Sequence, residues 1–344
     1  MRVHVLESGH RELLDAFVLK APGSPIEQTW AWGELQCLVP GRPLFRVFAV
    51  VEGEDPEQTE NWVASFLLIR QEMGFGKSWL WAPRGPVFKP GLDAERSQEA
   101  WGLLEEACKN WARLGGDVFM RVEPGFLPES FYLGGQPSPE EYLPSHSLTL
   151  DLRLSEQALL EQMSQKGRYN IKVAEKSDVV VREATDLPAF YKILKETSER
   201  DGFAVHSLDF YADFLRVLGD SARFYVAEYE GRILGGLLLT LFGKTACYYF
   251  GASSNEDRKL MAPYLLQWHA IRESKKAGCE VYDFLGIAPD GKAGESHALR
   301  GVTQFKTRFG GERVDYSGAR VFVYRSLYWW ARQWLRALRR KWRA

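Results

Sequence analysis

The chain shows the same order of secondary-structure patterns twice, and this repeat restricts the fold more than any other feature of the sequence. The first set is three β-rich segments, a helical pattern and a short β-rich segment, at residues 45–54, 62–71, 78–88, 94–116 and 117–124. The second set has the same elements, at residues 223–232, 233–243, 245–253, 262–278 and 279–287. Each set therefore predicts three strands, a helix and a fourth strand.

Turn residues separate these patterns at the points where the repeat requires them. The pairs Glu230-Gly231 and Gly243-Lys244 lie between β-rich segments, as in antiparallel hairpins. Gly115-Gly116 and Gly278 follow the helical patterns, where a left-handed residue commonly ends a helix. Because a strand after each helix implies a crossover within a mixed sheet, we expect an α/β (α+β) fold with two mixed sheets.

Further helical patterns precede the second set, at residues 154–177, 186–202 and 207–219. Helices, three antiparallel strands, a helix and a strand are the order of the GCN5-related acetyltransferase fold, so the repeat predicts two such domains in tandem. In those enzymes a glycine-containing turn before the last helix holds the coenzyme A pyrophosphate through its backbone amides. Here that stretch, residues 258–263, reads RKLMAP. We therefore expect a different acyl donor, with a coenzyme A-dependent N-acyltransferase as the alternative.

The remaining composition argues against metal chemistry and against a membrane span. The four cysteines are far apart, and no histidine belongs to a His-Glu-x-x-His motif, so no metal site is expected. No apolar run reaches the roughly 18 residues of a spanning helix, and the first residues, MRVHVLESGH, lack the apolar core of a secretory signal. We expect a cytoplasmic protein.

The last twenty residues, 325–344, differ in charge from the rest of the chain. They hold seven of the 44 Lys and Arg residues and no acidic residue, so the other 324 residues carry 37 minus 45, or −8. A helical apolar spacing with arginines between its members predicts a basic amphipathic helix, through Leu327, Ala331, Trp334, Leu338 and Trp342. Three interpretations stay open: attachment to an anionic membrane surface, docking on the protein with solvated arginines, and contact with a polyanion such as RNA.

Several short motifs follow one another along most of the chain. They are Gln28-x-x-x-Trp32, Arg84-Gly-Pro-Val87, Arg121-Val-Glu-Pro124, Lys166-Gly-Arg-Tyr-Asn-Ile-Lys172, Glu199-Arg-x-Gly202, Ala262-Pro-Tyr-x-x-Gln-Trp268, Tyr282-Asp-Phe-x-Gly-Ile287 and Phe305-Lys-x-x-Phe-Gly310. In this order and spacing the chain resembles the FemABX family, the aminoacyl-tRNA-dependent transferases that build peptidoglycan branches.

The resemblance implies two acetyltransferase-like domains without a coiled-coil arm, because residues 187–219 have room only for two short helices. The first domain would be 1–150, completed by 318–324, and the second 151–317, with 325–344 as the basic helix. An amino acid (glycine, alanine or serine) would pass from aminoacyl-tRNA to the stem-peptide amine of a peptidoglycan precursor. Aminolysis of this activated ester needs no further cofactor. It needs positioning, loss of a proton from the amine, and stabilisation of the oxyanion.

Two residues are candidates for this chemistry through the resemblance. Lys306 occupies the position of the family's lysine near the reacting carbonyl, and the alternative is a surface lysine on a strand. Glu123 follows the first-domain arginine, where it would accept the amine proton or orient the substrate ammonium. A structural ion pair between Glu123 and Arg121 is the other interpretation.

The substrate-binding candidates lie in both predicted domains: Gln36, Arg84, Arg121, Lys166, Arg168, His206, Tyr248, Tyr264 and Asp283. Lys166 and Arg168 begin a basic run that suits phosphates, and a solvated helix face explains the run equally well. Gln36 and His206 stand where relatives acting on the UDP-linked pentapeptide carry a lysine and an arginine. With the basic tail, this favours lipid II at the inner membrane surface as acceptor. A non-catalytic membrane- or RNA-binding protein is the third alternative.

Overall fold

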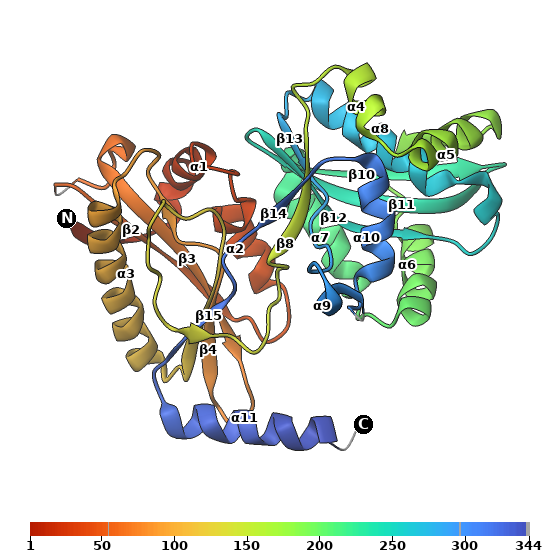
Figure 1. Ribbon diagram of the computed structural model, residues 1–344. Coiled ribbons are helices and arrows are strands. Elements are labelled where there is room, and N and C mark those ends of the chain that lie inside the picture. The colour runs from red at the N-terminus through yellow and green to blue at the C-terminus, as the bar shows by residue number, and fades with distance from the viewer. Residues whose placement is uncertain (54, 296, 342–344) are drawn as a thin grey trace. The chain divides into compact units, whose positions relative to one another are not determined.

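The computed structural model describes residues 1–53, 55–295 and 297–341, without the side chains of Asp201 and of 339–341. The chain forms two compact units, one of Met1–Ser145 with Tyr316–Ala344 and one of His146–Asp315 (Figure 1). The first boundary falls before His146 rather than after residue 150, because the strand that begins there pairs within the second unit. The C-terminal helix belongs to the first unit and is not a separate part of the fold.

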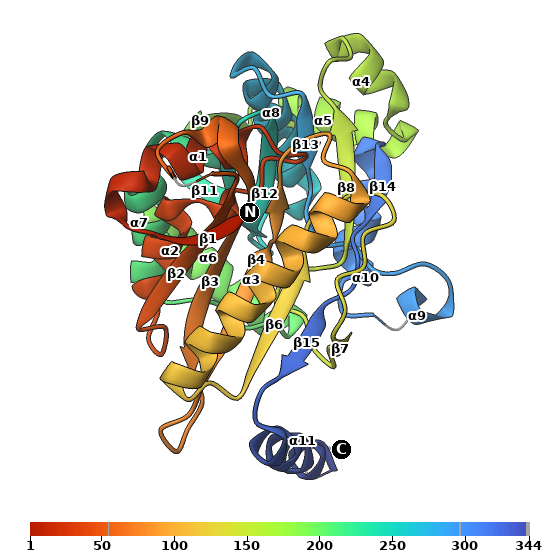
Figure 2. The same ribbon diagram turned by 90° about the vertical axis from the view of Figure 1, so that its left-hand side faces the viewer.

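The first unit is built on one mixed sheet with helices on both faces (Figure 2). Its strands are β1 (Arg2–Leu6), β2 (Leu44–Val51), β3 (Trp62–Glu72), β4 (Ser78–Arg84), β5 (Val87–Phe88), β6 (Phe119–Pro124), β7 (Gln136–Pro137) and β15 (Arg320–Val323). Its helices are α1 (Arg11–Leu19), α2 (Trp30–Cys37), α3 (Ala94–Gly115) and α11 (Ser326–Lys341). The sheet order is β1-β2-β3-β4-β6-β15-β7, and β5 pairs with β3.

Alternating side chains of β2 explain why both faces of this sheet are covered. Phe45 packs on Trp30 of α2 with ring centroids 5.0 Å apart, and Phe48 packs on Trp111 of α3 at 6.1 Å. Residues an odd number apart on a strand point to opposite faces, so each of these helices buries one side of the sheet.

The second unit repeats this plan. Its strands are β8 (His146–Asp151), β9 (Val180–Glu183), β10 (Ala222–Tyr229), β11 (Arg232–Phe242), β12 (Thr245–Ser253), β13 (Val281–Asp283) and β14 (Glu312–Asp315). Its helices are α4 (Glu156–Gln162), α5 (Gln165–Lys176), α6 (Leu187–Asp201), α7 (Leu208–Leu218), α8 (Ala262–Lys276), α9 (Lys292–Glu295) and α10 (Arg300–Lys306). The order is β14-β8-β13-β12-β11-β10-β9, and α6 and α8 cover opposite faces through Phe224 and Tyr225 of β10.

The two sheets share the feature that the sequence repeat predicts. In the first unit β2, β3 and β4 are antiparallel, and β6 returns parallel to β4 after helix α3. In the second unit β10, β11 and β12 are antiparallel, and β13 returns parallel to β12 after α8. This confirms the expected α/β class with two acetyltransferase-like mixed sheets. Between β9 and β10 the chain forms the short helices α6 and α7 and a 3-10 turn, Gly219–Ser221.

The helical pattern over 154–177 forms two helices instead of one. Met163 is extended, with ψ 151°, and the side chain of Ser164 accepts the N–H of Gly167 to begin α5. Serine satisfies an otherwise unpaired amide at a helix start, so the break has a local cause. It places the basic run Lys166–Lys176 on a helix of its own.

Candidate active site

Lys306 is the last residue of α10 and is buried, which corrects the expectation of a lysine on a strand. Only 6% of its surface is exposed. Its ammonium donates to the backbone carbonyls of Gly286 at 2.7 Å and Leu285 at 3.2 Å. The helix forms here because Thr303 closes a turn onto the carbonyl of Leu299 and receives the N–H of Ala288. An ammonium has three protons, so these bonds leave one for a further acceptor.

Asp283, the last residue of β13, and Tyr248, within the parallel strand β12, lie close to this lysine. Asp283 ends β13 and pairs in register with Cys247 of β12, one residue before Tyr248. The carboxylate of Asp283 accepts the N–H of Leu285 at 2.7 Å and the hydroxyl of Ser147. The Lys306 ammonium lies 5.6 Å from the centre of the Tyr248 ring. Open α/β sheets commonly bind ligands at this edge, where the strands end.

Burial sets the ionisation of these groups. It lowers the pKa of Lys306 to about 8, while the nearby charge of Asp283 acts in the opposite direction. Burial also raises the pKa of Tyr248 to about 12, so this phenol keeps its proton at neutral pH. Its hydroxyl lies only 1.9 Å from where a Cβ on Gly251 would be, so no larger residue fits at 251 without movement. A lysine with a pKa near neutral pH in such a place is typical of a functional site.

Aromatic packing holds the turn that carries Lys306. The ring of Tyr264, in the first turn of α8, lies 5.1 Å from Phe305 and is stacked 5.8 Å from the buried Phe309. Tyr264 therefore contacts the two phenylalanines that flank Lys306 in the sequence. Gly310 follows with φ +82°, a conformation that glycine adopts without strain.

The start of α5 packs directly on the same turn. A Cβ on Gly167 would lie 2.5 Å from the carbonyl oxygen of Arg308, and Ser164 donates its N–H to that oxygen at 2.9 Å. Glycine is required at this position because the two backbones approach so closely. The two motifs around Gly167 and Lys306 are therefore parts of one structure.

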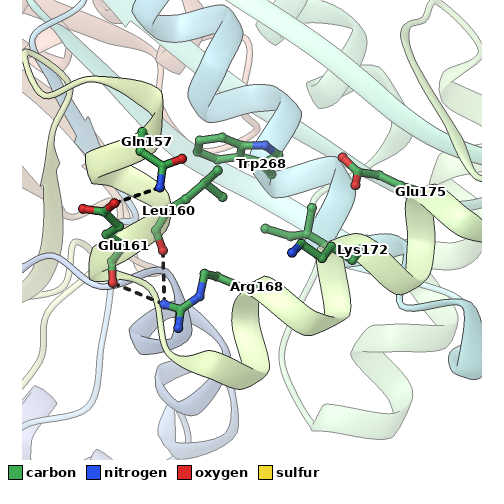
Figure 3. Close-up of a pocket in the computed structure, with 8 residues that line it drawn as sticks. Gln157, Leu160, Glu161, Arg168, Lys172, Glu175 and Trp268 are labelled. Atoms are coloured by element: carbon green, nitrogen blue, oxygen red, sulfur yellow. Dashed lines mark hydrogen bonds between the residues drawn. The ribbon is translucent and has the colours of Figure 1, made fainter.

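Lys166 and Arg168 have different surroundings. Lys166 is exposed, whereas Arg168 donates to the carbonyls of Leu160 at 3.3 Å, Glu161 at 3.2 Å and Met163. Arg168 thus caps the C-terminal end of α4, where cations are favourable. It also borders a pocket of about 420 Å³ between α4, α5 and α8 (Figure 3), lined by Gln157, Leu160, Glu161, Arg168, Ile171, Lys172, Glu175 and Trp268.

His206 lies on an aromatic cluster of the second unit. Its ring stacks on Phe210 with centroids 4.0 Å apart and meets the edge of Phe250 at 6.2 Å. Phe250 is on β12, two residues beyond Tyr248, so His206 approaches the same strand as the lysine site.

In the first unit, Glu123 is surrounded by hydrogen-bond donors. Its carboxylate accepts the backbone N–H groups of Tyr142 at 2.7 Å and Leu143 at 2.9 Å, and the indole N–H of Trp81 at 3.0 Å. Burial raises the pKa of Glu123, and these bonds oppose the shift. The contacts favour the structural interpretation, in which Glu123 holds the 140–143 loop. Proton acceptance by Glu123 stays a prediction.

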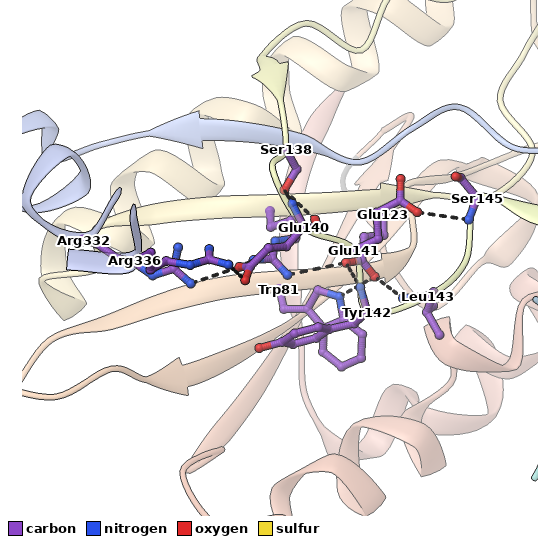
Figure 4. Close-up of polar contacts among 11 residues, drawn as sticks. Trp81, Glu123, Ser138, Glu140, Glu141, Tyr142, Leu143, Ser145, Arg332 and Arg336 are labelled. Atoms are coloured by element: carbon purple, nitrogen blue, oxygen red, sulfur yellow. Dashed lines mark hydrogen bonds and ion pairs between the residues drawn. The ribbon is translucent and has the colours of Figure 1, made fainter. Parts of the chain in front are cut away.

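Arg121 lies 3.7 Å from Glu123 and is only 1% exposed. Its guanidinium lies beside the neighbouring rings of Trp79 and Tyr142, 4.7 and 4.8 Å from their centres. It donates to Glu140 at 3.0 Å, and Glu140 also contacts Arg332 and Arg336 of α11 (Figure 4). Arg121 is thus enclosed by protein groups of its own unit.

Gln36 and Arg84 are also held by internal contacts. The side-chain oxygen of Gln36 accepts from Arg42, whose guanidinium lies 5.3 Å from the centre of the Trp81 ring. Arg84, with φ +52° at the end of β4, donates to the carbonyl of Pro144 at 2.9 Å and lies 4.1 Å over Tyr316.

Sequence reasoning missed Arg42, Glu140 and Ser147, which complete these contacts. Arg42 and Glu140 lie in loops and Ser147 in β8, and none belongs to a recognisable motif. Only the tertiary structure brings them to Gln36, Arg121 and Asp283.

Among the residues that the structure describes, no three His, Cys, Asp or Glu side chains gather closely enough to ligate a metal ion. None of the helices in this described part of the chain combines the length and the apolar character that a membrane crossing requires.

The two mixed sheets with their covering helices define the class of fold, a tandem of two GCN5-related acetyltransferase-like units. Comparison with solved structures agrees on this fold. FemX covers 96% of this chain and 99% of its own, with a TM-score of 0.80 and 18% identity. A tandem GNAT protein from the clavulanic acid biosynthesis pathway covers 94% and 99%, with a TM-score of 0.54 and 13% identity.

Sequence comparison identifies the family. The model of the FemAB family matches residues 134–232 and 229–336. The UDP-N-acetylmuramoylpentapeptide-lysine N(6)-alanyltransferase of Weissella viridescens is 27% identical over 246 residues, which are 65% of this chain and 71% of that protein. The chain belongs to the FemAB family, and it is an aminoacyltransferase.

Proposed function

We propose that this enzyme transfers an amino acid (glycine, alanine or serine) from aminoacyl-tRNA to the stem-peptide amine of a peptidoglycan precursor. The observation that carries the proposal is the buried Lys306 ammonium, which binds the carbonyls just after β13 and lies over Tyr248 of β12. Family membership and the acceptor in the Weissella alanyltransferase's name support the choice of substrate.

The reaction forms one amide bond and breaks one ester bond. The nitrogen of the acceptor amine attacks the ester carbonyl, and the carbonyl electron pair moves to oxygen. Lys306, with one proton not used by Leu285 and Gly286, stabilises that oxyanion. Collapse of the intermediate expels the ribose oxygen, which takes up a proton, while the amine nitrogen loses one.

The groups around Lys306 position it for this role. Asp283 holds the N–H of Leu285 and so shapes the loop whose carbonyls bind the ammonium. In a largely dry site a cation acts on a developing charge more strongly than in water. The same dryness lowers the pKa of Lys306, so Asp283 is needed to keep a useful fraction of it charged.

The structure does not favour the coenzyme A alternative. In the turn before α8, the N–H groups of Leu260, Met261 and Tyr264 bind the carbonyls of Asp257, Arg258 and Met261. Pro263 has no N–H at all. At this helix start the N–H groups of residues 260, 261 and 264 are therefore already used, and residue 263 has none.

We favour lipid II over the UDP-linked pentapeptide as acceptor, at the inner face of the cell membrane. At position 36 the chain has a neutral amide that accepts from Arg42, and at 206 a histidine packed on Phe210. Neither arrangement resembles the fixed cation pair expected for a nucleotide diphosphate. The basic segment 325–344 would provide peripheral contact with the membrane.

One experiment tests the proposal. The protein is incubated with lipid II or the UDP-linked pentapeptide and a panel of charged tRNAs, and the precursor is weighed by mass spectrometry. We expect a gain of one amino-acid residue, larger with lipid II. No gain with any tRNA, combined with acetylation from acetyl-CoA, would exclude tRNA-dependent transfer. A gain only with the nucleotide precursor would overturn the preference for lipid II.

A further inference from the structure

Three separate segments of the first unit expose large apolar side chains. Phe75, in the β3–β4 hairpin, is 99% exposed. The others are at least 65% exposed, and we call the five together the apolar end: Phe75, Leu114, Leu327, Trp330 and Trp334. Isolated exposed apolar residues are ordinary, but a cluster of this size marks an interaction surface.

The strand register places these segments at one end of the sheet. The β3–β4 hairpin closes beyond the pair Glu72 and Ser78, and β6 begins level with the start of β4 because the two are parallel. β15 ends at Val323 opposite Phe119, the first residue of β6. The hairpin tip, the end of α3 and the start of α11 therefore meet there, as both views show (Figures 1 and 2).

Side-chain contacts agree with this placement. The ammonium of Lys77, two residues after Phe75, lies 4.7 Å from the centre of the Tyr328 ring. The guanidinium of Arg325 lies 3.8 Å from where a Cβ on Gly116 would be, two residues after Leu114. The hairpin and the end of α3 are thus both adjacent to α11.

Helix α11 docks on the unit through a face other than its apolar stripe. Trp329 is buried against Phe119 at 4.8 Å, and Arg332 and Arg336 turn toward Glu140. The described start of the predicted stripe faces outward, since Leu327, Ala331 and Trp334 are exposed; Leu338 is half-buried, and Trp342 lies outside the described residues. Docking on the protein therefore leaves the apolar stripe available to another surface.

The turn around Phe75 exposes the aromatic ring of Phe75 and holds its backbone in an unfavourable conformation. Phe75 has φ +55°, between Gly74 at +37° and Gly76 at +62°. A bulky residue rarely adopts this conformation, and here the aromatic ring packs on almost nothing. A strained backbone that displays a fully exposed ring indicates that the ring binds something outside the unit.

We propose that the apolar end is a membrane-binding surface that inserts Phe75, Trp330 and Trp334 into the headgroup region of an anionic bilayer. The segment 325–344 holds seven cations and no acid, and two of these cations, Arg332 and Arg336, face Glu140. Its net positive charge, with Lys77 and Arg113 nearby, complements an anionic surface; Glu72 is an exposed carboxylate at the hairpin. A polyanion in solution fits less well, because Arg332 and Arg336 face Glu140 while the outward side is aromatic and aliphatic.

This proposal extends the proposed function, in which the acceptor is lipid-linked. It rests on the proposed function only for the reason why the protein would bind a membrane. Arg84 lies at the far end of β4 from the hairpin. Seven strand residues span about 23 Å, so a bilayer bound at the apolar end would lie roughly that far from Arg84.

Vesicle flotation of the full chain, without donor or acceptor, tests the surface separately from turnover. Vesicles of phosphatidylcholine are compared with vesicles containing about 30% phosphatidylglycerol. We expect binding to the anionic vesicles, weakened at high salt. The double variant Trp330→Ser/Trp334→Ser should lower the partition coefficient by at least about tenfold, and Phe75→Ser by about three- to tenfold.

A matched control is Tyr169→Ser, which removes an exposed ring from the second unit and should leave binding unchanged. Thermal melting checks that each variant is folded. If the Trp330/Trp334 and Phe75 variants bound the anionic vesicles as strongly as the unchanged chain, the proposal would be overturned. So would tRNA binding or self-association that depends on these same residues in a chain that does not float with vesicles.

Discussion

Arg121 donates a hydrogen bond of 3.0 Å to Glu140, and Arg121 is almost completely buried. Arg332 and Arg336 of α11 contact the same carboxylate (Figure 4). One side chain thus links a central strand of the first sheet to the C-terminal helix. Three guanidinium groups around one carboxylate hold a net positive charge, so the arrangement depends strongly on Glu140.

Glu140→Gln should destabilise the first unit. The substitution removes the countercharge of a buried arginine, and we expect a loss of about 1–3 kcal/mol in the free energy of unfolding. Denaturant titration measures this, and partial proteolysis shows whether α11 is released. Glu129→Gln, at an exposed position, is the control. Equal stability of both variants would mean that the cluster contributes nothing.

Lys306→Met should affect turnover much more than acceptor binding. Methionine fills a similar volume but cannot stabilise an oxyanion, so we expect the single-turnover rate to fall by at least about a hundredfold. The dissociation constant for lipid II, measured by calorimetry, should change by less than about threefold. A variant that retains its rate would show that Lys306 only supports the 283–286 loop.

The pH dependence of the transfer rate should reflect the ionisation of Lys306. The free amine of the acceptor becomes tenfold more abundant per pH unit up to its pKa of about 10.4. Lys306, with its pKa lowered to about 8, loses its charge above that pH. The single-turnover rate should therefore rise up to about pH 8 and then level off.

Lys306→Arg supplies the comparison for this pH profile. Arginine stays protonated over the whole range, so its profile should keep rising above about pH 8, from a lower starting rate. The same plateau in the wild type and in Lys306→Arg would assign the upper pKa to another group.

Gly167→Ala should destabilise the second unit and slow transfer. The new Cβ would lie 2.5 Å from the carbonyl oxygen of Arg308, so the backbone must shift, at a cost of about 1–3 kcal/mol. Gly301→Ala, in α10, meets nothing within 4 Å and should stabilise by about 0.5–1 kcal/mol. Thermal melting distinguishes the two, and shifts of the same sign would contradict the close approach of α5 to the turn.

Glu123→Gln should show whether Glu123 only anchors the 140–143 loop or also accepts a proton during catalysis. The amide has one acceptor oxygen, so a backbone N–H or the Trp81 indole loses its partner, at about 1–3 kcal/mol of stability. If Glu123 only anchors the loop, the single-turnover rate should fall less than about tenfold. A drop above a hundredfold in a folded variant would instead support proton acceptance.

The fold was predictable because its signal is local and repeated. Strand and helix patterns such as 62–71 and 94–116 reappear as β3 and α3 nearly unchanged. The boundary between the two units was harder to predict from the sequence, because the segment from His146 pairs with β13 and β14, which are remote in sequence. The spacing of α11 correctly predicted its apolar stripe but not which face touches the protein, because Glu140 decides that contact.

The candidate site was predictable only in part. The motifs indicated Lys306 and Asp283, and the fold brings both close to Tyr248, a candidate that belongs to no motif. The alternative interpretation placed Lys306 at the surface of a strand. The structure forms a helix there, and Phe305 and Phe309 meet Tyr264. Contacts made by loop residues such as Arg42 have no sequence pattern to reveal them.

The position of β15 has a consequence for how the protein is made. This strand closes the first sheet against β6, yet its residues follow the whole second unit in the chain. During synthesis the ribosome completes His146–Asp315 while the edge of β6 is still unpaired. The half of the protein that is translated first thus finishes folding last, and a premature stop codon just before residue 320 would damage the N-terminal half of the molecule.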